Sequence, residues 1–187
     1  MNIYLVRHGE TDWNKEGRLQ GQRDIPMNQH GILQMERIGA YMANGGYGID
    51  KIISSPLQRA RMGAAIIASQ IGYGENEIII EPLLIERSFG DAEGMVWTAE
   101  VCLDDGKFKE ESVRELCKRA AEGVKKYAVE ENGNILIVSH GAILKAVIVA
   151  LTHGKITYYD SGVSIAQGGI SHIKYEDEQY AIKWIQV

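Results

Sequence analysis

MNIYLVRHGETDWN, residues 1–14, is the stretch that decides the fold of this 187-residue chain. Residues 3–6 form a short apolar run of the kind expected in a buried strand. The run ends at Arg7, His8 and Gly9, which supply a cation, an imidazole and a residue free to adopt positive φ. Open α/β folds bind ligands at the carboxyl edge of the sheet, where such strands end. We therefore predict a binding site directly after the first strand.

Two later predicted strands also end in reactive side chains. Residues 51–54 lead into the sequence SSPLQR at 54–59, and residues 135–138 lead into SHG at 139–141. The carboxyl ends of parallel strands meet at one edge of a sheet, so these groups are expected to converge. Two arginines and two histidines would then form a compact positive site. The planar fork of arginine matches phosphate oxygens, which favours a phosphoryl ligand, although charge alone also permits a carboxylate.

The order of the predicted elements indicates the fold class. Strands are expected over residues 3–6, 51–54, 78–80 and 135–138, with a terminal hairpin over 170–175 and 180–187. Helices are expected over 31–44, 57–71, 110–130 and 142–151, the second with Pro56 in its first turn. Because strands alternate with helices, we predict an α/β fold, a three-layer α/β/α sandwich whose central sheet is mostly parallel with an antiparallel edge. The chain, 1–187, is predicted to be a single domain with a small lid or excursion around residues 95–110.

The composition excludes several classes of protein. A formal net charge of −5 argues against general binding to nucleic acid or to a membrane surface. Cys102 and Cys117 lack paired spacing, so we expect unbridged thiols in a reducing cytoplasm. The first apolar run is interrupted at residue 7, too early for a signal peptide, and polar residues within 135–151 indicate a strand and a helix rather than a membrane span. We expect a cytoplasmic protein.

Five motifs, in order and in spacing, resemble those of the histidine phosphatase superfamily, which includes cofactor-dependent phosphoglycerate mutases and many broad phosphatases. They are RHGET at 7–11, GRLQG at 17–21, SSPLQRA at 54–60, LIERSFGDAEG at 84–94 and VSHG at 138–141. The resemblance implies a phosphoglycerate mutase-like fold. No glycine-rich nucleotide loop follows the first strand, so side chains rather than a glycine loop are expected to hold the phosphate.

The resemblance also implies a mechanism through phosphohistidine. His8 would attack phosphorus, and water would later hydrolyse the phosphohistidine. Arg7, Arg59 and His140 would hold the phosphoryl oxygens and stabilise charge in the transition state. Glu86 would protonate the leaving oxygen and then deprotonate the incoming water.

Four further residues are expected to bind the substrate, a small phosphomonoester. Asn14, Gln20 and Gly21 would line the pocket, and the helix that begins at Gly141 would add free N–H groups that favour an anion. Neither a metal nor another cofactor is expected, because cations already surround the phosphate.

Two neighbouring acids and one substitution leave questions about the site. Glu93 and Asp91 lie close to Glu86 in the sequence, and Glu93 is the first alternative for the acid role. Ala92 stands where the resembled family usually has a tryptophan, so the pocket wall is expected to differ from that of relatives.

The stretch after Glu86 bears on the choice between phosphatase and mutase. In the mutases that this resemblance points to, a longer insert carries an adjacent arginine pair. Here residues 86–116 are short and mostly acidic, and Arg87 and Arg114 stand apart. We therefore predict a phosphatase, resembling broad-specificity or α-ribazole phosphatases, and keep a phosphoglycerate mutase as the alternative. The sequence does not separate a broad-specificity phosphatase from an α-ribazole phosphatase, and it does not exclude a sugar-phosphate substrate.

Two hypotheses from other classes complete the set. The first is a catalytically silent phosphate-binding module, which is weakened because nucleophile, arginines, second histidine and acid are all present. The second is a metal-binding protein that uses His8 and His140. That hypothesis does not account for Arg7 and Arg59, which would repel a metal ion.

Overall fold

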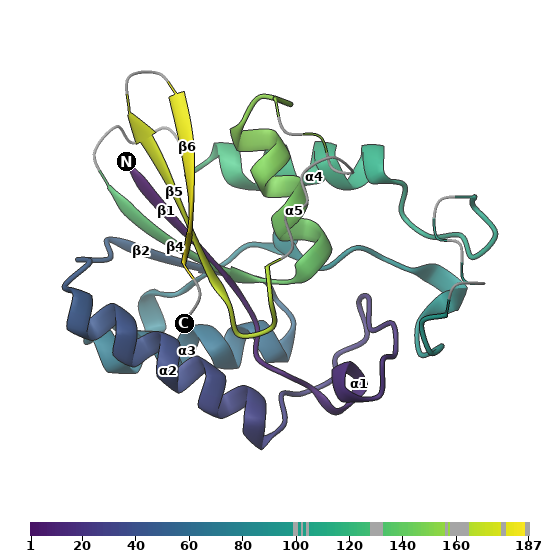
Figure 1. The fold of residues 1–187 in the computed structure, drawn as a ribbon, viewed down its shortest axis with the longest axis horizontal. Coiled ribbons are helices and arrows are strands. Elements are labelled where there is room, and N and C mark those ends of the chain that lie inside the picture. Colours follow the sequence, from purple (N-terminus) through teal and green to yellow (C-terminus); the bar gives the residue numbers. More distant parts are fainter. Residues whose placement is uncertain are drawn as a thin grey trace.

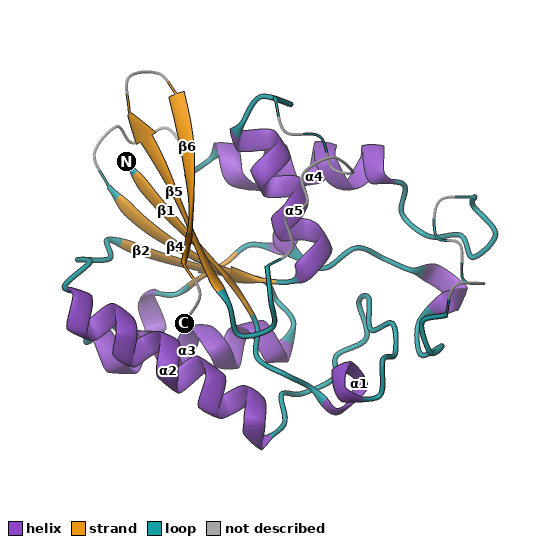
Figure 2. Ribbon diagram, in the orientation of Figure 1, coloured by secondary structure: helices purple, strands orange, loops and turns teal. Residues whose placement is uncertain are grey.

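A six-stranded sheet runs through the middle of the computed structural model (Figures 1 and 2). The structure describes residues 1–98, 101, 103, 105–127, 133–155, 157, 165–176 and 179–185. The strand order is β3-β2-β4-β1-β5-β6. The strands are β1 (Asn2–Arg7), β2 (Lys51–Ser54), β3 (Ile79–Ile80), β4 (Asn134–Ser139), β5 (Ile170–Glu176) and β6 (Gln179–Ile185). The first four in spatial order are parallel, and β5 and β6 form an antiparallel edge. The predicted sheet is confirmed.

Helices cover both faces of this sheet. They are α1 (Asp12–Lys15), α2 (Gln29–Gly45), α3 (Gln58–Ile71), α4 (Val113–Lys125) and α5 (Gly141–Leu151), with short 3-10 helices η1 (Glu75–Glu77), η2 (Pro82–Leu84) and η3 (Gly90–Ala92). Ile3 and Leu5 of β1 pack with α4 and α5, whereas Tyr4 and Val6 pack with α2 and α3. Alternate side chains of a strand point to opposite faces, so an apolar run without polar interruptions is buried on both sides. The three-layer sandwich is therefore confirmed.

The local sequence fixes where the helices on one face begin and end. The side chain of Asn28 accepts a hydrogen bond from the Gly31 N–H (2.9 Å) at the start of α2. The same helix ends at Gly46, whose φ of 61° favours glycine. Helix α3 begins after Leu57, whose N–H donates to the hydroxyl of Ser55. Pro56 therefore lies in the turn before the helix, and its predicted place in the first helical turn is wrong.

The predicted helix over 110–130 begins later than expected. Ser112 and Glu115 form a capping box, in which each side chain accepts a hydrogen bond from the backbone N–H of the other residue. This cap starts α4 at Val113, and the helix ends at Lys125. Before the cap, Glu111 N–H donates to the carbonyl of Ser88, which directs the chain away from a helical path. Residues 128–130 of the prediction lie outside the described residues.

The predicted excursion around 95–110 is described only in part, because residues 99, 100, 102 and 104 lie outside the description. Val101 and Leu103 are buried in a small cluster with Leu19. At the neck of the excursion, the Asp91 N–H donates to the carbonyl oxygen of Phe108 (2.8 Å). The two ends of the excursion are thus tied together, while its role as a lid stays a prediction.

Among the described residues, no helix has both the length and the apolar character needed to cross a membrane.

Candidate active site

The carboxyl ends of three parallel strands meet at a pocket of about 200 Å³. Arg7 at the end of β1 lies opposite Ser139 of β4, and Ser54 of β2 lies opposite Val138. The pocket is lined by Arg7, His8, Asn14, Arg18, Leu19, Gln20, Gly21, Arg59, Glu86, Phe89, Gly141 and Ala142. Eight of the nine residues selected from the sequence are in this lining. The ninth, His140, packs against His8 with ring centroids 5.1 Å apart.

His8 is held in one orientation by hydrogen bonds to both ring nitrogens. Its Nδ1 lies 2.7 Å from the carbonyl oxygen of Gly9, and the Nε of Arg59 donates to its Nε2 (3.2 Å). Because a carbonyl oxygen only accepts, the ring proton is on Nδ1 and Nε2 keeps a lone pair. Burial, followed by the charge of Arg59, lowers the pKa of His8 well below its usual value. The imidazole is therefore neutral at neutral pH and keeps a lone pair on Nε2.

The backbone after His8 is fixed by close packing against the start of α2. A Cβ atom at Gly9 would lie 2.1 Å from the carbonyl oxygen of Gly31, a distance that no side chain can occupy. Only glycine permits this approach of two backbone segments. His8 is thus carried on a strand end anchored to a helix of the core.

Arg59 is a fully buried cation whose guanidinium is bonded to two carbonyl groups of one loop. Its Nη1 donates to the carbonyl of Arg23 (2.7 Å) and its Nη2 to that of Gly21 (2.8 Å). Burial lowers the pKa of Arg59 to about 10, so the group remains a cation at neutral pH. Gly21 has a φ of 52°, and a Cβ there would lie 2.1 Å from Oε1 of Glu93. The glycine allows the loop to present its carbonyl oxygen to Arg59.

Arg7 reaches the pocket beside the start of α5. Its Nη1 donates to the carbonyl oxygen of Ile165 (3.1 Å), whereas its buried Nε has no hydrogen-bond partner among the described residues. A Cβ at Gly141 would lie 3.3 Å from Cζ of Arg7. The glycine at this position leaves room for the guanidinium, which is one of the cations available to an anionic ligand.

Glu86 projects its carboxylate onto the N-terminus of α5. Oε1 accepts hydrogen bonds from the backbone N–H groups of Arg87 (2.8 Å) and Ile143 (3.1 Å). Oε2 accepts from the N–H of Ala142 (3.3 Å), which also lines the pocket. These bonds hold the carboxylate at the pocket wall.

The two alternative acids are engaged elsewhere. Oε1 of Glu93 accepts the backbone N–H groups of Gln22 (3.0 Å) and Phe89 (3.2 Å), and Oε2 lies 3.5 Å from Nε of Arg23. Asp91 is exposed and pairs with Lys109 (3.2 Å). Of the three acids considered, Glu86 alone lines the pocket.

Arg119 of α4 holds the backbone of the Glu86 loop. Its Nη1 donates to the carbonyl oxygens of Leu83 (2.6 Å) and Ile85 (2.8 Å), and its Nη2 donates to that of Glu86 (3.3 Å). The same guanidinium makes two hydrogen bonds of 2.8 Å to the carboxylate of Glu111. This helix residue therefore sets the position of the loop that carries the candidate acid.

Some pocket residues were not selected from the sequence. They are Arg18, Leu19, Phe89 and Ala142. Arg18 and Leu19 belong to the motif GRLQG, and Phe89 belongs to the motif LIERSFGDAEG. Their position in these motifs was the signal that could have identified them as pocket residues. Ala92 is fully buried in the cluster with Leu19 and is absent from the pocket lining, so the expected effect of this residue on the pocket wall is not direct.

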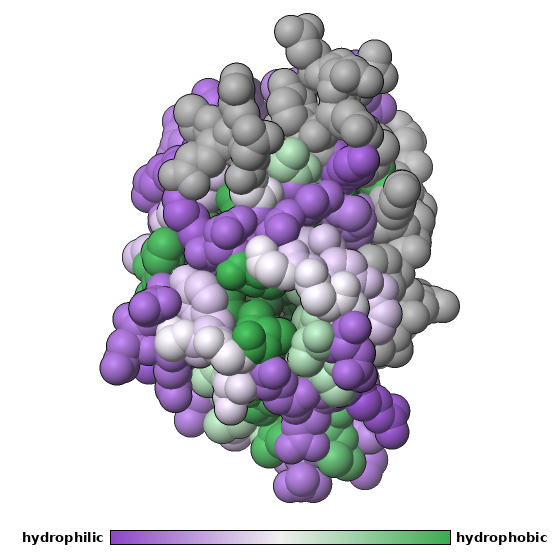
Figure 3. All heavy atoms as spheres, turned by 90° about the vertical axis from the view of Figure 1, so that its left-hand side faces the viewer, coloured by the Kyte–Doolittle hydropathy of each residue, from purple (hydrophilic) through white to green (hydrophobic). Residues whose placement is uncertain are grey.

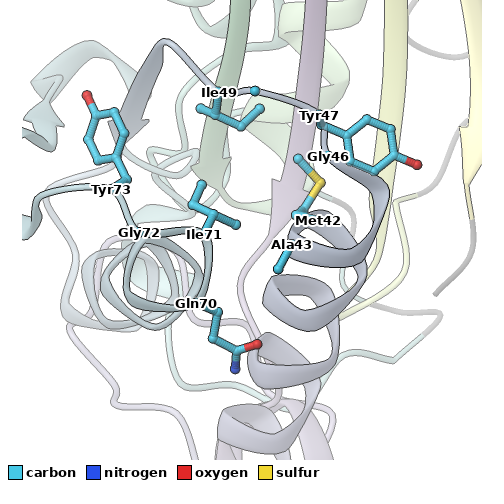
Figure 4. A pocket seen from close by; sticks show the side chains of 10 residues that line it. Met42, Ala43, Gly46, Tyr47, Ile49, Gln70, Ile71, Gly72 and Tyr73 are labelled. Atoms are coloured by element: carbon cyan, nitrogen blue, oxygen red, sulfur yellow. The ribbon is translucent and has the colours of Figure 1, made fainter.

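A second depression, of about 350 Å³, lies where α2 and α3 end, away from the three strand ends. Figure 3 shows a hollow with a hydrophobic floor on the face that carries these helix ends. Figure 4 shows Met42, Ile49 and Ile71 around the space, with Tyr47 and Tyr73 at its sides. None of the lining residues carries a cation, so this depression does not suit a phosphoryl group. Within the described part of the chain, no group of three or more His, Cys, Asp or Glu side chains could hold a metal ion.

Comparisons with known proteins agree with this geometry. The family model for the histidine phosphatase superfamily (branch 1) matches residues 3–187. The chain is 33% identical over 189 residues to the uncharacterized phosphatase PhoE of Bacillus subtilis (strain 168), covering 97% of this chain and 92% of that protein. It is 31% identical over 200 residues to the probable phosphoglycerate mutase GpmB of Enterobacter sp. (strain 638), covering 99% and 90%. A crystal structure of a phosphoserine phosphatase mutant from Entamoeba histolytica in complex with phosphoserine superposes with a TM-score of 0.79 at 26% identity, covering 97% and 94%.

Proposed function

We propose that this chain, which belongs to the histidine phosphatase superfamily (branch 1), hydrolyses small phosphomonoesters through a phosphohistidine on His8. One observation carries the proposal. The lone pair of His8 Nε2 is directed at a buried cation, Arg59, at the wall of a pocket that also contains Arg7 and Glu86. A phosphoryl group that enters this pocket meets a neutral nucleophile, two guanidinium groups and a carboxyl group.

The proposed reaction has two steps. In the first, Nε2 of His8 forms a bond to phosphorus while the ester P–O bond breaks, and the leaving oxygen takes a proton from the carboxyl group of Glu86. In the second, the carboxylate of Glu86 takes a proton from water, whose oxygen bonds to phosphorus as the N–P bond breaks. Arg7 and Arg59 compensate the charge on the phosphoryl oxygens in both transition states, so the reaction needs no metal.

The pocket lining favours a phosphatase over a mutase. A phosphoglycerate mutase must also hold the carboxylate of its substrate, which calls for further cations. Beyond Arg7 and Arg59, the lining contributes one cation, Arg18, and this residue is exposed and already paired with Glu16. The similarity to a protein named as a phosphatase supports the same choice, and the similarity to a probable phosphoglycerate mutase keeps the mutase as the alternative. We place the activity in the cytoplasm, on the grounds of cysteine usage.

A screen of phosphomonoesters in the presence of EDTA tests the proposal. The panel contains p-nitrophenyl phosphate, phosphoserine, sugar phosphates and 3-phosphoglycerate with and without 2,3-bisphosphoglycerate. Release of inorganic phosphate without added metal is the expected result. Interconversion of phosphoglycerates faster than phosphate release would establish a mutase instead. Binding of phosphate without turnover of any ester would establish a silent phosphate-binding module.

A further inference from the structure

The second histidine of the site has a buried hydroxyl as its partner. Oγ of Ser55 lies 2.6 Å from Nε2 of His140, and both residues are fully buried. The same oxygen accepts the backbone N–H of Leu57 (3.3 Å). Nδ1 of His140 is buried and has no hydrogen-bond partner among the described residues. The ring therefore has one nitrogen that is held and one that is available.

The number of protons decides which nitrogen is the donor. Burial, followed by the charge of Arg59, lowers the pKa of His140 well below its usual value, so the ring is neutral and carries one proton. If that proton were on Nε2, it would point at Oγ of Ser55. The hydroxyl proton would then need another acceptor, and no described residue other than His140 provides one. A buried donor without an acceptor is costly, by about 1–3 kcal/mol.

The opposite arrangement leaves one buried group unpaired, the Nδ1–H of His140, whereas a proton on Nε2 leaves two, the hydroxyl proton of Ser55 and the lone pair of Nδ1. The hydroxyl of Ser55 donates to Nε2 of His140, its oxygen accepts from Leu57, and the ring proton is on Nδ1. Nδ1–H is then a neutral donor beside His8, whose ring is 5.1 Å away. A phosphoryl group on His8 would offer this donor the acceptor that it lacks. The opposite tautomer would direct a lone pair at an anionic oxygen.

We infer that Ser55 is a positioning residue that holds His140 in the Nδ1–H tautomer, so that Nδ1 donates to the phosphoryl oxygens. The identity of the acceptor rests on the proposed function. The two histidines thus share a tautomer and use it in opposite ways. His8 directs its lone pair at the substrate because Gly9 accepts its Nδ1 proton, and His140 directs its proton at the substrate because Ser55 occupies its Nε2.

Heteronuclear NMR of the protein labelled with ¹⁵N-histidine tests this inference directly. Correlations between ring protons and ring nitrogens distinguish the two tautomers without any substrate. The expected pattern for His140 is a protonated Nδ1 and an unprotonated Nε2. On addition of orthovanadate as the probe, the Nδ1 proton of His140 is expected to shift as it forms a hydrogen bond.

Ser55→Ala should move the tautomer equilibrium of His140 towards Nε2–H and lower kcat by about 10- to 100-fold, with a smaller change in KM. Ser55→Cys keeps a similar volume but is a weaker donor, so its tautomer ratio and its kcat should lie between those of the wild type and of Ser55→Ala. This variant replaces Ser55→Ala if the alanine variant does not fold. Ser54→Ala is the matched control. Ser54 is equally buried and donates to the backbone oxygen of Ser55 (3.0 Å), so its loss should leave the ring pattern of His140 unchanged.

Two results would overturn the inference, namely a protonated Nε2 of His140 in the wild-type protein, or a Ser55→Ala variant with unchanged ring pattern and kcat. Failure of the proposed function is recognised separately. In that case the wild-type protein hydrolyses no phosphomonoester, whatever the tautomer of His140. An active enzyme with the other tautomer contradicts the role of Ser55 alone.

Discussion

The Nε of Arg59 donates a hydrogen bond to Nε2 of His8 across 3.2 Å, so a buried cation covers the nucleophilic lone pair before substrate arrives. In the proposed reaction, attack of His8 on phosphorus requires this bond to open. The guanidinium does not need to leave, because a phosphoryl oxygen beside Nε2 can accept the same N–H. In this proposal Arg59 first orients His8 and then stabilises the phosphoryl group that His8 attacks.

Arg59→Lys should lower kcat/KM by about 100- to 1,000-fold, since an ammonium cannot bond to His8 and to the carbonyls of Arg23 and Gly21 in one planar arrangement. Steady-state kinetics with p-nitrophenyl phosphate measures the loss. Arg61→Lys, an exposed change on the same helix, is the matched control and should behave as wild type. Equal activity of the two variants would remove Arg59 from the mechanism.

His8→Ala should abolish phosphate release in EDTA, because the covalent route then has no acceptor. Rapid quenching of the wild-type enzyme during turnover should trap phosphate that is labile in acid and stable in base, and mass spectrometry should locate it on His8. His30→Ala is the control, since this histidine is exposed and outside the pocket. Full activity of the His8 variant would exclude the nucleophile role.

Glu86→Gln should impair alkyl phosphates more than activated aryl phosphates, because only a poor leaving group needs the proton. The slope of log kcat/KM against the pKa of the leaving alcohol is the measurement, and it should become steeper in the variant. Glu93→Gln supplies the comparison, because Glu93 does not line the pocket and its carboxylate is bonded to the backbone N–H groups of Gln22 and Phe89. Equal losses for both ester types in Glu86→Gln would assign the acid role to another residue.

Arg119→Met should reproduce part of the Glu86→Gln phenotype, because it releases three carbonyl oxygens of the loop that carries the acid. We expect a loss of about 10-fold in kcat on alkyl phosphates and a smaller loss on aryl phosphates. Arg114→Met, an exposed change on the same helix, is the control. A loss that is uniform across leaving groups would show that Arg119 acts on the fold in general rather than through Glu86.

The free energy of unfolding should fall as the pH drops below about 6.5, the usual pKa of a histidine in an unfolded chain. The pKa values of His8 and His140 are lowered in the fold, chiefly by burial. At any pH between the folded and the unfolded pKa of each histidine, the unfolded state therefore binds more protons than the folded state. Each histidine then costs up to about 1.4 kcal/mol per pH unit, and neither contributes well above pH 6.5. Urea unfolding at about pH 7.5 and about pH 5.5 measures the slope. A His8→Ala/His140→Ala variant with the wild-type slope would contradict this assignment.

Much of the fold could be read from the sequence, because its central strands are buried on both faces. Residues 3–6 and 135–138 are apolar without alternation, residues 51–54 have two isoleucines at their centre, and each stretch ends at a polar motif. The start of α4 was misplaced because acidic helix formers precede it. The capping pair Ser112 and Glu115 was readable and marks the true boundary.

The residues of the candidate site could likewise be predicted only in part. Arg7, His8 and Glu86 were found because they belong to motifs at strand ends or in the loop beside them. Ser55 and Arg119 were missed as contributors, since their partners are 85 and 33 or more residues away along the chain. The hydrophobic periodicity of a sequence does not indicate which side chain of a helix contacts a distant loop. These contacts could therefore be identified only in the folded structure.

The hydrogen bond between Asp91 and Phe108 has a consequence for protein engineering. It makes the intervening stretch an insert whose two ends meet on the scaffold. The entropic cost of closing a loop grows slowly, by about 0.6 kcal/mol for each doubling of its length. The residues that follow Asp91 are not free to change in number, because the Leu19 N–H donates to the carbonyl oxygen of Met95 (2.9 Å) and the Trp97 N–H donates to that of Gly17 (2.8 Å). Residues can therefore be added at the exposed turn 105–107 while Glu86 and the loop at 17–21 keep their places. A change of length at this turn alters the excursion without altering the residues that line the pocket.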